Sequence, residues 1–483
     1  MGLIGIVAGL ALLMALAFRG WTILLLAPAA ALVAAAFSGE PLLAHWTQTF
    51  MSAASGFVAQ FFPLFLLGAL FGKLMEDSGA VDAIARFMTR TLGPTRAILA
   101  VVLAGALVTY GGVSLFVAFF VLAPMGLALF RSGAVPRRLL PATIALGTST
   151  FTMSALPGTP AIQNAIPMPF FGTTAFAAPG LGTIAAIIML GFGLFWLERR
   201  RIAAKKAGEG FEGPLAEKKP VADKTVLREL ASTAREFDPA EIESGARTPG
   251  RPPIALALLP LVVVVAVNLA MAQVVLPMID TAYLQEARFG GVSLSAVGGV
   301  WAVATALLAG IVVLLATSWA RFAKLRESVD AGANASVLPV LSVASLVGFG
   351  AVVAAMPAFE AVREFVLGIG GGPLVSLALA TNILAALTGS ASGGMTIALD
   401  ALGPTFMQIA AETGLDPALM HRVAVIASGT LDSLPHNGAV VTMLAVCGCT
   451  HRESYLDIVM VAVVGALIGL VAVIGLGTVF GSF

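Results

Sequence analysis

Long apolar stretches fill most of the chain and alternate with short polar tracts. Six stretches are apolar almost throughout, namely residues 3–18, 21–37, 178–197, 254–276, 291–318 and 455–480. A helix spans the hydrocarbon core of a bilayer with about 20 apolar residues. Shorter or interrupted apolar stretches lie between these six, so the pattern predicts roughly ten to fourteen membrane crossings. We therefore expect an all-α polytopic membrane protein.

The composition agrees with a membrane protein. Charged residues make up 11% of the 483 residues and hydrophobic residues 59%, whereas soluble domains carry roughly 25% charged residues. The formal net charge of +1 indicates no nucleic-acid partner. Cys447 and Cys449 lie in an apolar segment and are best interpreted as inert small hydrophobic side chains. The first residues lack a basic start and a cleavage site, so a retained first helix is expected.

Four polar tracts interrupt the apolar sequence at 109–114, 147–160, 388–396 and 428–438. Glycines and prolines in them break any helix, and hydrocarbon cannot solvate the backbone groups that a break frees. Such breaks are tolerated where they are buried in protein or line a cavity, and half-helix ends of this kind hold the substrate or ion in many transporters. The sequence therefore predicts a solute-binding site built from two hairpin-like tips and two broken helices.

The second half of the chain repeats landmarks of the first at a nearly constant spacing. Gly93-Pro94 corresponds to Gly372-Pro373, and a short amphipathic helix near 81–90 corresponds to one near 358–368. Further matched pairs are Thr109 and Thr388, Gly112 and Gly394, Pro136 and Pro417, Gly147-Thr148 and Gly429-Thr430, and Ser154–Pro157 and Ser433–Pro435. Two such halves joined by an odd number of crossings would lie inverted in the membrane.

This repeat divides the chain into five parts. We expect N-terminal membrane helices at 1–50, a first inverted repeat at 51–197, a charged linker at 198–253, connecting helices at 254–334 and a second inverted repeat at 335–483. The linker carries 12 Lys/Arg and 10 Asp/Glu, with one helix predicted near 224–236. Its basic residues next to a membrane helix predict a cytoplasmic position. The tract 73–79, which contains Lys73, Glu76 and Asp77, is predicted to leave the membrane.

The interrupted tracts supply the candidate binding residues. Freed N–H groups and helix N-termini can hold an anion, while freed carbonyls and hydroxyls can hold a cation. No basic side chain is expected at the tips, since Arg131, Arg137, Arg138 and Arg422 are predicted at or near helix ends. The candidate substrate-binding residues are Gly111, Gly112, Ser114, Thr148, Ser149, Thr150, Ser390, Ser392, Gly393, Gly394, Ser428, Gly429, Thr430, Ser433, His436 and Asn437.

Asp432 is the sharpest single candidate, because an ionised carboxylate inside a membrane protein is costly and usually functional. It is predicted to couple protons or bind a cation; the alternative is a helix cap satisfied by backbone N–H groups. His436 could share the proton or bind substrate, and a structural contact with loop carbonyls is an equal alternative. Asp400 is predicted to be structural, and Asn164 and Asn382 to bridge packed helices.

Enzyme functions are poorly supported. The chain has no HExxH, GxSxG or GxxxxGK[ST] motif, and Ser428, Asp432 and His436 lie too close together on one broken helix for a hydrolytic triad. No cofactor is expected beyond a coupling ion. A channel or a membrane-embedded hydrolase remains a remote alternative, because two repeats with discrete polar tips suit alternating access better.

Residues 428–442 (Ser-Gly-Thr-Leu-Asp-Ser-Leu-Pro-His-Asn-Gly-Ala-Val-Val-Thr) and 447–457 (Cys-Gly-Cys-Thr-His-Arg-Glu-Ser-Tyr-Leu-Asp) resemble the gluconate permease (GntP) family of the ion transporter superfamily. The similarity is greatest to its 3-hydroxybutyrate or short-chain hydroxy-acid permeases. It implies a homodimer in the bacterial inner membrane, elevator-type movement of the two hairpins and two broken helices, and proton-driven import of a small carboxylate.

The chain also departs from related transporters. It lacks the Ser-Asn-Thr signatures of the sodium-coupled dicarboxylate branch, which favours protons over sodium as the coupling ion. Its tips lack an arginine that could clamp a second carboxylate, which favours a monocarboxylate such as 3-hydroxybutyrate. Gluconate or another sugar acid, and sodium coupling, are the alternatives.

Overall fold

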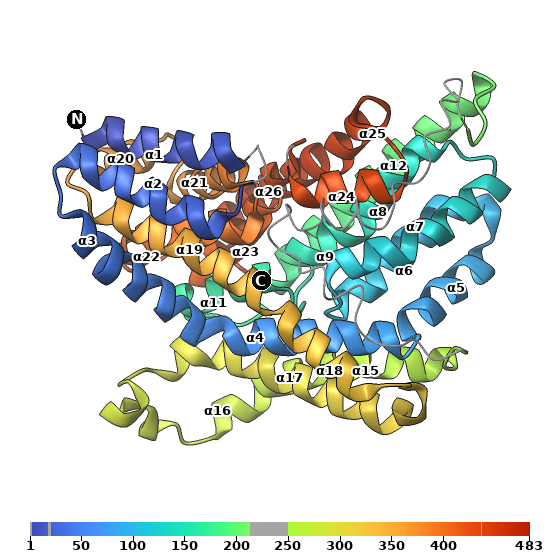
Figure 1. The fold of residues 1–483 in the computed structure, drawn as a ribbon, viewed down its shortest axis with the longest axis horizontal. Helices are drawn as coiled ribbons and strands as arrows, with labels where there is room; N and C mark the ends of the chain where they lie inside the picture. Colours follow the sequence, from blue (N-terminus) through green and yellow to red (C-terminus); the bar gives the residue numbers. More distant parts are fainter. Residues whose placement is uncertain (1, 18–20, 213–249, 436) are drawn as a thin grey trace.

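The protein is helical throughout the part of the chain that the computed structural model describes, which is residues 2–17, 21–212, 250–435 and 437–483 (Figure 1). The all-α prediction is confirmed in this coarse form. The first half contains α1 (Gly2–Ala17), α2 (Ile23–Ser38), α3 (Leu42–Ala44), α4 (Met51–Asp77), α5 (Ala80–Leu92), α6 (Ala97–Tyr110), α7 (Leu115–Ser132), α8 (Leu140–Thr148), α9 (Phe151–Ser154), α10 (Ile162–Ala165), α11 (Pro167–Phe171) and α12 (Pro179–Lys206).

The second half begins after the charged linker. It contains α15 (Ile254–Ala270), α16 (Leu276–Met278), α17 (Leu294–Ser318), α18 (Leu325–Ala335), α19 (Val337–Ala355), α20 (Phe359–Leu367), α21 (Pro373–Thr388), α22 (Ala391–Thr413), α23 (Pro417–Ser428), α24 (Gly438–Val446), α25 (His451–Ile458) and α26 (Gly465–Phe480). Short 3-10 or π-helical turns join several of them, including η1 (His45–Phe50), η3 (Arg137–Leu139) and η8 (Leu431–Ser433). The predicted linker helix at 224–236 lies outside the described residues.

Fewer helices are long enough to span a bilayer than the apolar pattern predicted. Six described helices pass a test of length and composition, and a seventh is formed if the pair Ala80–Leu92 and Pro94–Tyr110, bent by 103°, counts as one span. Four other apolar helices have only 10–17 residues. The prediction of ten to fourteen crossings is therefore too high, because the polar tracts cut apolar sequence into helices too short to cross.

The same order of helices occurs twice. The series α4 to α8 is matched by α19 to α23, including the short amphipathic helices α5 and α20 that the sequence predicted. Gly93 (φ 69°, ψ 178°) and Gly372 (φ 89°, ψ 176°) lie between the second and third helices of their series and have nearly the same backbone conformation. Positive φ values are easily reached only by glycine. This recurrence agrees with the repeat, whose inverted orientation stays a prediction.

The two halves are interleaved in space. Figure 1 shows α1, α2, α20 and α21 at one end of the molecule and α5, α6 and α7 at the other, with α15 to α18 along one edge beside α4. The first long helices of the two series, α4 and α19, pack against each other, as do α12 and α26, the last long helices of the two halves. The four interrupted tracts consequently meet near the middle.

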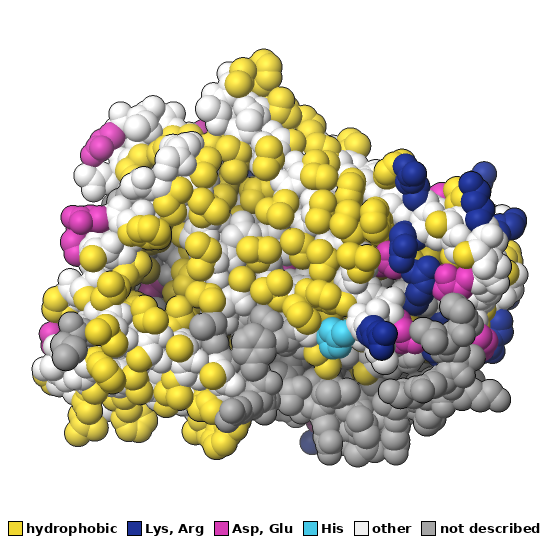
Figure 2. Space-filling view, turned by 90° about the horizontal axis from the view of Figure 1, so that it is seen from above, with side chains coloured by type: hydrophobic (Ala, Val, Ile, Leu, Met, Phe, Trp, Pro, Cys, Tyr) yellow, Lys and Arg dark blue, Asp and Glu magenta, His cyan; other side chains and the backbone are white. Residues whose placement is uncertain are grey.

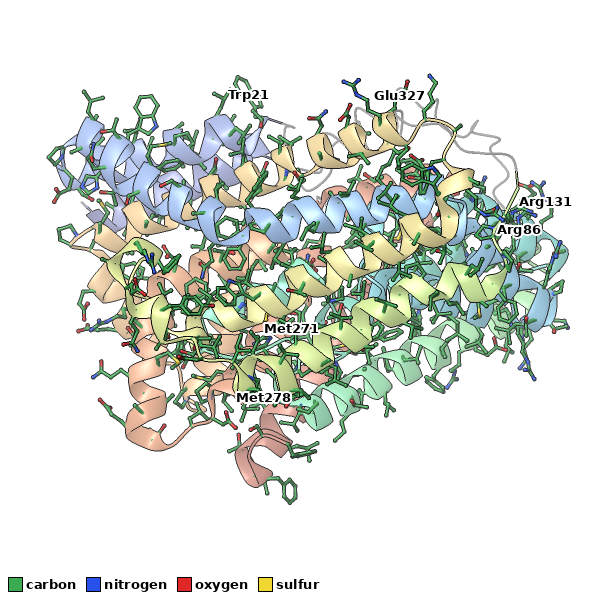
Figure 3. All side chains as sticks on the ribbon, turned by 90° about the horizontal axis from the view of Figure 1, so that it is seen from below. Trp21, Arg86, Arg131, Met271, Met278 and Glu327 are labelled. Carbon is green, nitrogen blue, oxygen red and sulfur yellow. The ribbon has the colours of Figure 1, made fainter. Side chains whose placement is uncertain are left out.

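The surface separates apolar from charged regions. Figure 2 shows a broad hydrophobic face, with Lys and Arg gathered toward one end and Asp and Glu visible at both ends. Figure 3 places Arg86 and Arg131 at that same end. Helix α12 reaches Lys206, so the first residues of the predicted linker continue this membrane helix. The basic residues at its end agree with a cytoplasmic face.

A buried ion-pair cluster joins the two halves at the charged end. Asp457 of α25, whose side chain is 1% exposed, accepts hydrogen bonds from Arg138 (3.2 Å), Arg200 (2.9 Å) and the indole N–H of Trp196 (2.9 Å). Glu209 pairs with Arg138 through two further bonds of 2.7 and 2.9 Å. Because each polar atom has a partner, the cluster stabilises the contact between α12 and α25 instead of leaving charges unpaired.

The charged end of α4 is buried inside the protein. Helix α4 continues to Asp77, and Lys73, Glu76 and Asp77 are only 1%, 7% and 2% exposed, while the departure of 73–79 from the membrane stays a prediction. Lys73 Nζ lies 3.1 Å from Asp77 Oδ1, one helical turn away. The ion pair allows these charges to be buried against neighbouring helices, which the sequence pattern alone does not reveal.

Candidate functional site

The helix breaks occur where the sequence predicts them. The first break lies between Tyr110, the last residue of α6, and Leu115, the first of α7. Residues 149–150 separate α8 from α9, and residues 389–390 separate α21 from α22. The fourth break lies between Ser428, the last residue of α23, and Gly438, the first of α24. Two polar side chains start new helices after these breaks. Ser390 Oγ accepts the N–H of Gly393 at 3.1 Å, and Asn437 Oδ1 accepts those of Ala439 and Val440 at 2.6 and 3.2 Å. Both are N-caps.

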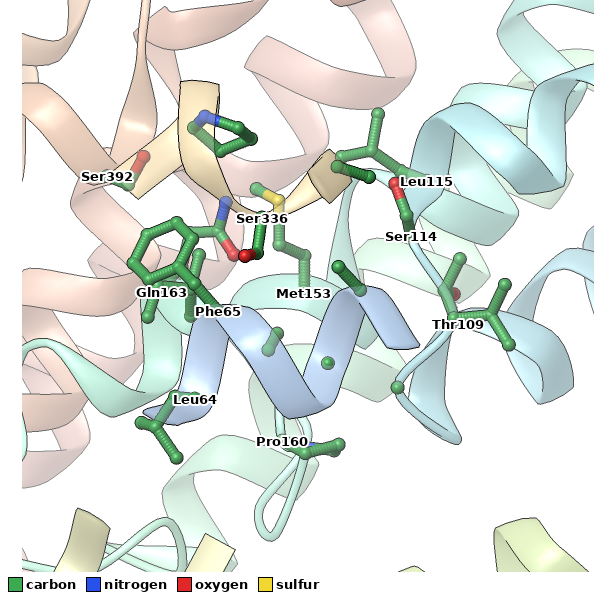
Figure 4. A pocket seen from close by; sticks show the side chains of 18 of the residues that line it. Leu64, Phe65, Thr109, Ser114, Leu115, Met153, Pro160, Gln163, Ser336 and Ser392 are labelled. Atoms are coloured by element: carbon green, nitrogen blue, oxygen red, sulfur yellow. The ribbon is translucent and has the colours of Figure 1, made fainter. Parts of the chain in front are cut away.

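Three of the four breaks open into one cavity of about 170 Å³ (Figure 4). Four predicted binding residues line it, namely Gly112, Ser114, Thr148 and Ser392. Figure 4 shows Gln163, Ser336 and Met153 in the middle of the lining, between Ser392 on one side and Ser114 on the other. The opposite wall comes from α4, through residues such as Leu64 and Phe65, and from the start of α19. The cavity thus combines an apolar wall with a few hydroxyl groups and one amide, which is typical of small-molecule sites.

A second, smaller cavity of about 20 Å³ adjoins the first and contains the fourth break. The predicted residues Ser149, Asp432, Ser433 and Asn437 line it, and Leu115, Met153 and Gln163 line both cavities. Its volume suits about one water molecule, which needs roughly 10–15 Å³ on a comparable measure. Ser433 Oγ donates to Asp432 Oδ1 at 3.1 Å. Asp432 therefore lies beside the larger cavity, separated from it by a thin layer of side chains.

Several predicted hydroxyl groups point away from both cavities. Thr150 donates to Leu146 O at 2.7 Å and Ser428 to Val425 O at 2.8 Å, both within their own helices. Thr430 donates to Ala427 O at 2.8 Å and to Asn382 Oδ1. Ser and Thr commonly satisfy themselves in this way. Ser390 lines neither of these cavities; its Oγ lies 3.2 Å from Ser392 Oγ and accepts the N–H of Gly393 at the tip.

The remaining predicted residues also lie at the tips without lining a cavity. These are Gly111, Gly393, Gly394 and Gly429. At Gly394 the requirement for glycine is a close approach, because a Cβ there would lie 2.5 Å from Leu384 C and against the backbone of Ala385. The two helices of the second hairpin can meet only because this side chain is absent. His436 lies outside the described residues.

Hydrogen bonds tie each hairpin to the broken helix of its own half. Thr109 of α6 donates to Gly105 O (2.8 Å) and lies 3.2 Å from Thr152 Oγ1 of α9. In the second half, Asn437 Nδ2 donates to Gly389 O at 2.9 Å, and Asn382 of α21 accepts from Thr430, the kind of bridge predicted for Asn382. Each hairpin and its broken helix are therefore connected through polar side chains near the cavities.

Arg422 is a buried charge whose position the sequence interpretation did not predict. It was predicted near a helix end, but it lies within α23 and is completely buried. Its guanidinium donates to Ala177 O (3.1 and 2.7 Å), Ser154 O (3.2 Å) and Asn164 Oδ1 (3.3 Å). No described carboxylate pairs with it. The backbone carbonyls of Ser154 and Ala177, at the two ends of the segment 154–177, make this burial possible. A charge inside an apolar stretch was the available signal.

A neighbouring buried histidine was also missed. His421 Nδ1 lies 2.6 Å from Thr173 Oγ1, and its Nε2 lies 3.2 Å from Asn164 Oδ1. Asn164 in turn donates to Thr159 O and Ala175 O, both at 3.0 Å. This asparagine thus holds the unwound segment against α23, which is the bridging role predicted for it. Its neighbour in the chain, Gln163, lines both cavities.

The two cysteines are buried and free. Burial raises the pKa of the Cys449 thiol to about 11, so the thiol is protonated at neutral pH. This agrees with the interpretation of both residues as unreactive.

An all-helical chain with several membrane-length helices, whose interrupted helices enclose a polar cavity, has the architecture of a secondary membrane transporter. Residues 10–330 match the family CitMHS, described as "Citrate transporter", and the chain belongs to this family. It is 41% identical over 490 residues to the "Uncharacterized transporter YxjC" of Bacillus subtilis, covering 99% of this chain and all of that protein. It is therefore a multi-pass membrane transporter.

Two further similarities are more distant. The "Low-affinity gluconate transporter" of Escherichia coli K12 is 29% identical over 184 residues, which is 37% of this chain and 35% of that protein. This supports the resemblance to gluconate permeases in general, and the relationship to hydroxy-acid permeases stays a prediction. The solved structure of MtrF from Neisseria gonorrhoeae, described as one of "a Class of Antimetabolite Efflux Pumps", has a TM-score of 0.52 at 15% identity over 91% of this chain and 85% of its own. That likeness concerns the fold alone.

Proposed function

We propose that the protein imports a small hydroxy-monocarboxylate such as 3-hydroxybutyrate by proton symport. The observation that carries this proposal is the buried guanidinium of Arg422, which no described carboxylate neutralises and which lies behind a small cavity lined by hydroxyl groups. A buried charge without a counter-ion is unfavourable. One substrate carboxylate would compensate it, and the hydroxyls of Ser114, Thr148 and Ser392 could bind the carboxylate and hydroxyl groups of the substrate.

Arg422 is close enough to the cavity to attract an anion without touching it. Its acceptors Ser154 and Asn164 are the chain neighbours of Met153 and Gln163, which line the cavity. Two unit charges roughly 10 Å apart, at an effective dielectric constant of about 20, attract each other by about 1.7 kcal/mol. This contribution changes a dissociation constant by more than tenfold. The single positive charge favours a monocarboxylate over citrate, the substrate in the family's name, which carries three carboxyl groups.

Competition for uptake separates the candidate substrates. In proteoliposomes, excess 3-hydroxybutyrate should suppress uptake of labelled 3-hydroxybutyrate more strongly than gluconate or citrate does. Dominance by gluconate or citrate would reject the hydroxy-monocarboxylate assignment and favour the substrate named for the corresponding relative or family. Counterflow tests the class of protein, because a channel shows no trans-stimulation and a hydrolase consumes the solute.

Asp432 is the proposed proton-coupling group, together with His436. Its carboxylate lines the small cavity next to the substrate site, beside Ser149. Asp432→Asn should abolish accumulation driven by a proton gradient and leave counterflow exchange intact. Wild-type pH dependence in this variant would mean that Asp432 only stabilises the broken helix. Uptake that survives collapse of the proton gradient but requires sodium would establish the sodium alternative.

We further propose elevator-type movement in a homodimer, and the two-sided lining of the larger cavity suits such a movement. One wall comes from the hairpins and broken helices, and the other from α4, α18 and α19. In the proposed mechanism the hairpins and broken helices move together along the second wall and carry the substrate with them. Cysteines introduced at Gln163 and Ser336, on opposite walls, should stop uptake when crosslinked, and reduction should restore it. Full uptake in the crosslinked protein would contradict this movement.

A further inference from the structure

The buried charges at the end of α4 have no role in the function proposed above. Lys73 and Asp77 form an ion pair inside the protein, and Asp77 Oδ2 has no hydrogen-bond partner. Ionisable residues inside membrane proteins are costly to bury and commonly mark proton pathways. This pair is therefore a candidate for a second ion-linked site.

Helix α18 covers this pair and contributes a second unsatisfied oxygen. A Cβ at Gly332 would lie 2.9 Å from Leu70 Cα and 3.2 Å from Lys73 Cβ, so α18 and α4 are in close contact there. The two helices run in opposite directions, because the end of α18 meets the cavity-lining turn of α4. Ser328, one turn before Gly332, consequently faces the turn of α4 that carries Asp77. Ser328 is fully buried, and its Oγ has no partner.

The pair also lies close to the substrate cavity. Ala69 lines the cavity, and Lys73 follows it one turn later on the same face of α4, about 6 Å along the helix axis. A Cβ at Gly72, between them, would lie 3.5 Å from Ser114 N at the tip of the first hairpin. A change of charge at Lys73 and Asp77 would therefore act on an anion in the cavity over a short distance along α4, although Glu76 beside them also lines a separate cavity of about 400 Å³.

We propose that Asp77 takes up a proton that strengthens substrate binding. The carboxylate becomes a carboxylic acid, whose new O–H on Oδ2 can bond toward Ser328 directly or through one water. Lys73 keeps its proton and its longer contact with Glu76 at 4.0 Å, so the group formed by Lys73, Glu76 and Asp77 changes from a net charge of −1 to neutral. A substrate monoanion in the cavity is then no longer repelled by this group, so proton and anion bind cooperatively. This inference rests on the proposed function, and it adds a site separate from Asp432.

Other charged groups surround the end of α4 and could influence this titration. Asp82 on α5 is paired with Arg86 and Arg251, and Lys324 ahead of α18 is paired with Glu327. Helices α17 and α19, which also pack against α4, carry no charged residue. The groups to be considered are Glu76, Asp82, Arg86, Arg251, Arg321, Lys324, Arg326, Glu327 and Asp330.

The test measures substrate affinity against pH in purified protein that carries Asp432→Asn and His436→Gln, which remove both proposed coupling groups. The dissociation constant of 3-hydroxybutyrate should rise by about tenfold from acidic to alkaline pH, the size of a charge interaction over roughly 10 Å. Adding Asp77→Asn should abolish this dependence and keep the affinity high at every pH. Asp330→Asn, an exposed matched control on α18, should leave the dependence unchanged.

Two further variants keep the test decisive if Asp77→Asn folds poorly. Ser328→Ala, which leaves both charges in place, should shift the midpoint of the pH dependence, and Lys73→Gln with Asp77→Asn should give low affinity at every pH. An unchanged midpoint in Ser328→Ala, or unchanged pH dependence in Asp77→Asn, would overturn the inference. Affinity that follows sodium and not pH would also overturn it and indicate a cation site. Failure of the wild type to bind or exchange any small hydroxy acid would instead reject the proposed function.

Discussion

Replacement of Asn437 tests how the second hairpin is held at the site. One side-chain atom, Oδ1, caps α24, while Nδ2 donates to Gly389 O at the hairpin tip. Loss of an N-cap costs about 1 kcal/mol, and a lost hydrogen bond that leaves a buried polar group unsatisfied costs about 1–3 kcal/mol. Asn437→Ala should therefore lower the free energy of unfolding by about 2–4 kcal/mol.

Two other substitutions separate these contributions. Asn437→Ser keeps a capping oxygen but cannot reach Gly389, so it should recover about 1 kcal/mol relative to Asn437→Ala. Asn437→Asp also keeps the capping oxygen, but its second oxygen is an acceptor and cannot bond to the Gly389 carbonyl. The stability of Asn437→Asp should therefore be no higher than that of Asn437→Ser. Thermal unfolding in detergent gives the stabilities, and counterflow exchange gives the effect on transport. Wild-type stability and exchange in both Asn437→Ser and Asn437→Asp would refute the link between the hairpin and the broken helix.

Three further predictions concern packing, a polar bridge and thiol reactivity. Gly394→Ala should lower the free energy of unfolding by about 3 kcal/mol, because the added Cβ would meet backbone atoms. Gly191→Ala is the control, since a Cβ there has no atom within 4 Å. Equal melting temperatures of the two variants would contradict this prediction. Thr109→Val should lower the free energy of unfolding by about 1–2 kcal/mol, because the hydrogen bonds to Gly105 O and Thr152 Oγ1 are lost. Thr183→Val, on the exposed surface of α12, should lower it less in the same melting assay. Because its pKa is about 11, Cys449 should react with maleimide slowly at neutral pH and faster toward pH 11 or after denaturation; rapid labelling of the native protein at neutral pH would show an accessible thiolate.

The helix breaks could be predicted from the sequence because a membrane leaves the backbone few choices. Glycine, proline and hydroxyl residues at membrane depth must be surrounded by protein or water, and the structure interrupts its helices at all four predicted tracts. The individual binding residues could not be assigned in the same way. Thr148 lines the cavity and Thr150, two residues later, does not, although both hydroxyls donate to a carbonyl one turn earlier in the chain. Because this bond satisfies either threonine, the residue type does not show which of them faces the cavity.

The burial of charged side chains was the second feature that the sequence did not predict. Arg422, Lys73 and Asp77 were all predicted at helix ends, since hydrocarbon excludes charge. The interior of this protein offers alternatives that depend on the tertiary fold: carbonyls of Ser154 and Ala177 for Arg422, and an ion pair under α18 for Lys73 and Asp77. The number of crossings was overestimated for a related reason, because short apolar helices count as spans in a sequence pattern but are too short in the structure.

The Asp457 cluster has a consequence for the biogenesis of the protein. Arg200 is made 257 residues before Asp457, its ion-pair partner among the described residues. At about 5–20 residues per second, the ribosome needs roughly 13–50 s to add that partner. Arg200 and Trp196 must therefore wait, already synthesised, for a carboxylate near the C-terminus. Docking of α25 onto α12 is consequently among the last steps of assembly, and a chain released early would leave the arginine of its first half without this counter-ion.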